Sequence, residues 1–80
     1  MPFIQMYVRP GRDEETKARA AEALVDAASK AWGAPREAFT VLFEEVSAEE
    51  WDAQVTAAII EPKRDKVLIE RGKRVTQVAE

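Results

Sequence analysis

The residue with the clearest chemical potential is Pro2, which stands directly after the initiator methionine. A small second residue permits removal of Met1, and the chain would then begin with the secondary amine of Pro2. An α-amino group has an ordinary pKa of about 8, and an apolar pocket would lower it further because burial disfavours the charged form. Pro2 is therefore a candidate general base if Met1 is removed; otherwise its nitrogen is an amide.

The side-chain types that the sequence lacks narrow the remaining chemistry. It contains no His and no Cys, which excludes a histidine base, a Ser–His triad, a thiol nucleophile, disulfides and the zinc-finger pattern. The serines, Ser29 and Ser47, suit helical or capping positions. If the chain is an enzyme, its base must be a carboxylate, a lysine, Tyr7 or the N-terminal amine, and we expect no metal site.

Length and charge indicate one small domain, 1–80, that needs a partner. Eighty residues leave a marginal core, and without disulfides oligomerisation is the remaining way to complete it. The net charge of −3 argues against nucleic-acid binding. The sequence has no apolar run of about 18 residues that would span a membrane and no signal-peptide pattern. We therefore expect a cytoplasmic protein.

The first half of the chain has the pattern of a strand followed by a helix. Residues 2–8 alternate in hydrophobicity, which is typical of a strand, and Pro10-Gly11 ends it. Asp13 is a candidate N-cap for the helix, and Gly33 suits its end. The apolar positions between them have helical spacing and form one stripe: Ala21, Leu24, Val25, Ala28 and Trp32.

Residues 39–46 form the predicted second strand, whose apolar side chains on both faces suit burial on two sides. The intervening helix provides the crossover for a parallel pair of strands. Two strands with one covering helix cannot stand alone as a sheet. This α/β (α+β) unit should therefore associate with a partner that extends the sheet and shields its edges.

A helical extension is predicted after the second strand. Ser47 and Glu50 match a capping box, and Pro62 should end or kink the helix that follows. Residues 63–71 are a second short helical candidate, which Gly72 ends. The predicted division is thus a β-α-β core at 2–46, a helical extension at 47–72 and a tail at 73–80.

The chain up to residue 51 resembles the 4-oxalocrotonate tautomerase family of the tautomerase superfamily. The resemblance runs without gaps and rests on an ordered set of segments: Met1-Pro2-Phe3-Ile4-Gln5, Gly11 to Lys17, Gly33-Ala34-Pro35, and Val41 to Val46 leading to Trp51. It implies the tautomerase fold, in which two β-α-β units form a four-stranded sheet with helices packed on it.

The resemblance also implies a reaction. In this family the N-terminal proline removes a proton next to a carbonyl and returns it elsewhere, without a cofactor. Carried over, Pro2 is the base of a keto–enol tautomerase acting on small 2-oxo or enol carboxylates. Arg12 would bind the substrate carboxylate, and Trp51 would line the pocket. From the residues alone, Arg12 also fits a surface charge at the start of the helix, and Trp51 a core residue.

Two departures from the best-known hexameric members affect the site and the assembly. Those members carry a second arginine on the second strand, where this chain has Thr40. The missing charge has four candidate replacements: Arg36, Lys63, Arg64 and Lys66. The helical extension stands in place of the family's Gly-rich hairpin, as in the longer, dimeric members that act on phenylpyruvate-like enols. We therefore expect a homodimer, with a hexamer as the second possibility.

Other functions remain open within this resemblance. One is dehalogenation or decarboxylation of a small carboxylic acid, in which a cationic prolinium acts as an acid while Glu44, Glu45 or Asp52 activates water. Another is a catalytically inactive assembly module, which Thr40 in place of the arginine favours. The pH dependence separates the two chemistries, because an amine base acts above its pKa and an ammonium acid below it.

Overall fold

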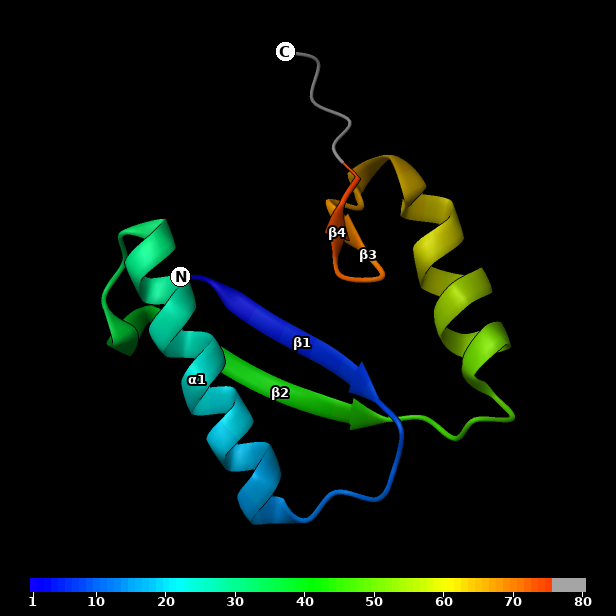
Figure 1. Ribbon diagram of the computed structural model, residues 1–80, viewed down its shortest axis with the longest axis horizontal. Helices are drawn as coiled ribbons and strands as arrows, with labels where there is room; N and C mark the ends of the chain where they lie inside the picture. The colour runs from blue at the N-terminus through cyan, green and yellow to red at the C-terminus, as the bar shows by residue number, and fades with distance from the viewer. Residues whose placement is uncertain (76–80) are drawn as a thin grey trace. The chain divides into compact units, whose positions relative to one another are not determined.

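The computed structural model describes residues 1–75, and the chain forms two compact units, Met1–Val46 and Ser47–Glu80. The first unit contains β1 (Phe3–Val8), α1 (Glu14–Trp32), a short 3₁₀ turn η1 (Arg36–Ala38) and β2 (Thr40–Glu45). The two strands are parallel, and their register runs from Phe3 opposite Thr40 to Val8 opposite Glu45. Figure 1 shows α1 lying along the β1–β2 pair. The predicted β-α-β unit is confirmed.

The limits of α1 follow from its capping residues. The Asp13 carboxylate accepts a hydrogen bond from the Thr16 N–H at 2.9 Å, which satisfies a donor that a helix start leaves without a partner. At the other end Gly33 has a left-handed backbone conformation, with φ of 83°, and its N–H donates to the Ser29 carbonyl. Both ends are those that the sequence predicts.

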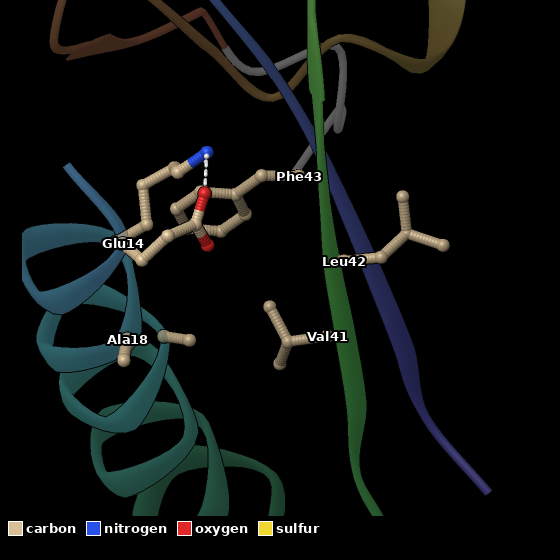
Figure 2. Close-up of a pocket in the computed structure, with 7 residues that line it drawn as sticks. Glu14, Ala18, Val41, Leu42 and Phe43 are labelled. Carbon is tan, nitrogen blue, oxygen red and sulfur yellow. Dashed lines mark ion pairs between the residues drawn. The ribbon is translucent and has the colours of Figure 1, made fainter. Parts of the chain in front are cut away.

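The sheet has one covered face and one open face within this unit. Figure 2 shows Val41 and Phe43 pointing toward α1 and Leu42 pointing away from it, as the alternation of a strand requires. On the open face Phe3 is 57% exposed and Leu42 is 37% exposed. The predicted burial of the second strand on two sides is therefore not achieved by this unit alone.

The second unit begins with a partly realised capping box. The Ser47 hydroxyl accepts a hydrogen bond from the Glu50 N–H at 3.3 Å, while the Glu50 carboxylate accepts from the Gln54 side chain at 3.1 Å. The chain then forms a wide helical segment, η2 (Asp52–Ile60), in which hydrogen bonds reach back five residues. Val55 is its buried residue.

The helix predicted for residues 63–71 is wrong beyond Lys66. A 3₁₀ segment, η3 (Glu61–Lys66), is followed by an antiparallel hairpin of β3 (Ile69–Glu70) and β4 (Lys73–Arg74). The physical reason is the turn: Arg71 has φ of 53° and Gly72 has φ of 78°, a pair of left-handed residues that joins two strands in a tight hairpin. A glycine that the sequence suggests as a helix stop is thus half of a hairpin turn.

The hairpin also changes the predicted boundaries at the C-terminus. Lys73 and Arg74 belong to β4 and not to a tail, and Val75 donates its N–H to the Leu68 carbonyl at 2.8 Å. Residues 76–80 of the predicted tail lie outside the described residues. Arg64 pairs with Glu61 inside η3 at 2.6 Å and joins η3 to the hairpin through its ion pair with Glu70 at 2.8 Å. Within residues 1–75, no helix is long and apolar enough to cross a membrane.

Candidate active site

Pro2 lies at the head of β1, where the strand begins to pair with β2. Its carbonyl accepts a hydrogen bond from the Thr40 N–H at 3.3 Å, so the backbone of Thr40 is next to Pro2. Met1 is fully exposed, whereas Pro2 is partly buried. The methionine therefore projects from the sheet, and its removal would uncover the Pro2 nitrogen without disturbing the strand pairing.

An apolar hollow of about 500 Å³, here called the proline hollow, surrounds this position. Its lining residues come from the starts of both strands and from the last turns of α1: Pro2, Phe3, Ile4, Ala28, Ala31, Trp32 and Phe39. None of these side chains is charged. Such surroundings favour the neutral form of a basic group over its cation.

A second hollow, here called the arginine hollow, has a volume of about 380 Å³ and lies where β1 leads into α1. Its lining residues combine cations with a small apolar surface: Met6, Val8, Arg9, Arg12, Thr16, Lys17 and Ala20. The predicted Arg12 is thus joined by Arg9, which the sequence analysis missed. The available signal was that both arginines lie within the short stretch between the predicted strand and Asp13.

The two hollows lie at opposite ends of β1 within one protomer. The strand has six residues, and at about 3.3 Å per residue it separates its ends by roughly 20 Å. A substrate of a few carbon atoms cannot span that distance. One protomer therefore does not bring Pro2 and Arg12 together, although both flank the same strand.

The third cation of the arginine hollow, Lys17, is held by carboxylates. Its Nζ lies 2.9 Å from Glu45 and 3.1 Å from Glu14, and hydrogen bonds to Glu45 first and Glu14 second raise the pKa of Lys17. The dashed line at Glu14 in Figure 2 marks its ion pair with this lysine. These ion pairs connect the start of α1 to the end of β2, so Lys17 has a structural role.

The Lys17 cluster also borders a third, smaller hollow of about 230 Å³ between α1 and β2. Its lining residues are Glu14, Lys17, Ala18, Ala21, Val41, Leu42 and Phe43. The small alanine side chains leave this space open. Because its lysine and its carboxylate are already paired with each other, it offers little to a charged substrate.

The remaining predicted site residues are distributed over both units. Arg36 forms an ion pair with Asp26, which links η1 to α1, and its exposed side chain is thereby partly engaged. Arg64 is engaged by Glu61 and Glu70. Trp51 is partly buried and belongs to the second unit with Lys63 and Lys66, so the first unit contains Pro2, Arg12, Arg36 and Thr40 alone of the predicted set.

The carboxylates proposed for the alternative chemistry differ in their surroundings. Glu45 is paired with Lys17, Glu44 lies opposite Tyr7 in the strand register, and Asp52 belongs to η2. None of the three is a residue that lines the proline hollow. Among residues 1–75, no group of three or more His, Cys, Asp or Glu side chains is suited to hold a metal ion.

Comparison with known proteins identifies the family of this chain. Residues 2–61 match the family described as "Tautomerase enzyme", a span that includes Pro2, both arginines of the arginine hollow and η2. The chain belongs to the tautomerase family. A curated relative is the probable tautomerase RSp0893 of Ralstonia nicotianae, which is 40% identical over 67 residues; the aligned part covers 81% of this chain and 96% of the relative. The family resemblance drawn from the sequence is confirmed.

Proposed function

We propose that this tautomerase-family chain interconverts the enol and keto forms of small 2-oxo carboxylates, without a cofactor, using the Pro2 amine as general base. The observation that carries the proposal is the position of Pro2 at the head of β1, in a hollow lined by uncharged, mostly apolar residues. The family match over residues 2–61 supports the reaction class. We expect the enzyme to act in the cytoplasm.

The proposed reaction moves one proton from oxygen to carbon. The Pro2 nitrogen, freed by removal of Met1, accepts the enol O–H proton, and the resulting prolinium returns a proton to the adjacent carbon as the C=O bond forms. The apolar surroundings lower the cost of keeping this amine neutral. A base whose pKa lies near the working pH is the most effective for such a transfer.

The carboxylate of the substrate requires a cation that the proline hollow does not contain. Among the described residues β1 pairs with β2 alone, so its other edge is available to a second copy. Antiparallel pairing of two β1 strands about a two-fold axis would bring the arginine hollow of one protomer toward Pro2 of its partner. We propose such a homodimer with a four-stranded sheet, in which each site contains Pro2 of one chain and the arginines of the other.

The first experiment on this proposal is a mass measurement followed by an assay. Intact mass spectrometry of protein expressed in the bacterial cytoplasm should give a chain that lacks Met1, and that chain should accelerate ketonisation of the enol of phenylpyruvate. A blocked variant is the matched control. It carries an added tag fused directly before Pro2, so that the Pro2 nitrogen remains an amide, and it should be inactive. Activity in the blocked variant would contradict the proposed base.

A further inference from the structure

Trp32 is the last residue of α1 and is unusually exposed. The helical spacing of the sequence places it in the apolar stripe of this helix, but 76% of Trp32 is accessible to solvent. Its side chain lines the proline hollow beside Pro2 and Phe39. A large aromatic side chain normally contributes most when it is buried. The exposed indole is therefore a candidate contact for a ligand.

The end of α1 is stabilised without any contribution from Trp32. Gly33 donates its N–H to the Ser29 carbonyl at 3.0 Å, and the Ser29 hydroxyl donates to the Ala34 carbonyl at 2.5 Å. These bonds satisfy the last turn of the helix and fix the direction of the chain after it. The backbone at the end of α1 is thus fixed by bonds that do not involve the indole, so a substitution of Trp32 leaves these bonds intact.

The surroundings of Trp32 connect it to the proposed base. Trp32 and Phe39 line the proline hollow together with Pro2. By strand alternation Phe39 lies on the α1 side of the sheet, as Val41 does. The hollow thus has an aromatic residue from the helix, another from the start of β2, and the proposed amine from β1. Its volume of about 500 Å³ lies within the usual range for small-molecule sites.

We propose that Trp32 is a specificity-determining residue that makes this enzyme prefer substrates with an aryl group on the carbon that receives the proton. This inference rests on the proposed function and adds the substrate's side chain to it. The aryl ring would pack against Trp32 and Phe39, since aromatic rings favour offset or edge-to-face contacts. The substrate carboxylate would lie away from this uncharged surface, toward the arginines of the second protomer.

The kinetic test compares two substrates in one variant. Trp32→Leu should lower the ratio of kcat/KM for the enol of phenylpyruvate to kcat/KM for the enol of 2-oxobutyrate by about tenfold, whereas Trp32→Phe should keep most of the preference. Ile69→Ala, a substitution of an exposed apolar residue of β3, is the control and should leave the ratio unchanged. An equal loss on both substrates, or an unchanged ratio in Trp32→Leu, would overturn the assignment.

A binding measurement separates this inference from the reaction itself. The chain has two tryptophans, so Trp51→Phe leaves Trp32 as the single indole fluorophore. Titration with 3-phenylpropionate should change its emission in a saturable manner, and titration with butyrate should not. Saturable quenching in a chain without tautomerase activity would support the aryl site and reject the proposed reaction. The absence of any aryl-specific change would overturn the role of Trp32 even in an active enzyme.

Discussion

At the scale of single residues, the proposed chemistry depends on two kinds of surroundings. Pro2 lies among apolar residues that disfavour a cation, whereas Arg9 and Arg12 line a hollow at the other end of β1 that suits an anion. The sequence predicts Pro2 and Arg12 individually, because an N-terminal proline and an arginine before a helix are local features. Arg9 and the exposed Trp32 could be recognised as candidate site residues only in the structure, because the hollows that they line are formed by several elements.

The first residue-scale prediction concerns the base. Pro2→Ala should lower kcat for ketonisation of the phenylpyruvate enol by about a hundredfold, the lower part of the range for losing a general base. Some activity should survive because the variant still begins with a primary amine. Mass spectrometry must first establish that Met1 is removed from the variant. Unchanged rates in the processed Pro2→Ala protein would exclude Pro2 from the mechanism.

A second prediction concerns the two arginines. Arg12→Ala and Arg9→Ala should each lower kcat/KM for a carboxylate substrate by about tenfold or more, because each removes a charged hydrogen-bond donor. Arg19→Ala removes a cation of α1 that lies outside the arginine hollow and serves as the matched control. An ester analogue of the substrate should lose most of this dependence. Wild-type kinetics of Arg12→Ala in a folded protein would leave Arg12 as a surface charge.

At the scale of elements, caps were predictable and the hairpin was not. Asp13 and Gly33 define α1 through interactions with residues a few positions away, and such short-range patterns are visible in the sequence. Arg71-Gly72 also resembles a helix end, because glycine with a left-handed backbone serves both helix stops and tight hairpin turns. Only the pairing of Ile69 with Arg74 decides between these two structures.

The cap of α1 gives a pH-dependent prediction. Hydrogen bonds from Thr16, through its side chain first and its backbone second, lower the pKa of Asp13 below its ordinary value of 3.8. The ionised carboxylate therefore stabilises the fold above that ordinary value, and its contribution is lost as the pH falls through the lowered pKa.

This dependence can be measured with a conservative variant. Asp13→Asn keeps a capping side chain but cannot ionise, so its thermal midpoint should fall less than that of the wild type on acidification from about pH 6 to about pH 2. Glu22→Gln, at an exposed carboxylate of α1, tests whether any lost carboxylate has the same effect. Parallel pH profiles of wild type and Asp13→Asn would contradict a stabilising ionised cap.

At the scale of the whole molecule, the β-α-β unit is incomplete in two respects. Its sheet has two strands and an open face on which Phe3 and Leu42 are exposed, and the proline hollow and the arginine hollow lie at opposite ends of one strand. The sequence predicts the need for a partner from length and strand number. The separation of Pro2 from Arg12 could not be predicted from their closeness along the chain, because β1 carries the chain away between them.

Association itself is the next prediction. Light scattering at micromolar concentration should give about twice the chain mass of 9.0 kDa, because a two-fold dimer is the commonest closed assembly and would extend the sheet through β1. A mass near six chains would replace the dimer with a hexamer while preserving the shared site. A stable monomer would contradict the need for a second copy.

The most direct test of a shared proline–arginine site is complementation between two variants of low activity. Pro2→Ala and Arg12→Ala proteins are mixed in equal amounts, unfolded and refolded together, and assayed on the phenylpyruvate enol. A mixed dimer would contain one site with an intact Pro2 and an intact Arg12, so random pairing should restore about a quarter of the wild-type rate. Refolding each variant alone provides the control. If the mixture is no more active than the average of the two variants, the proposed sharing of the site between protomers is wrong.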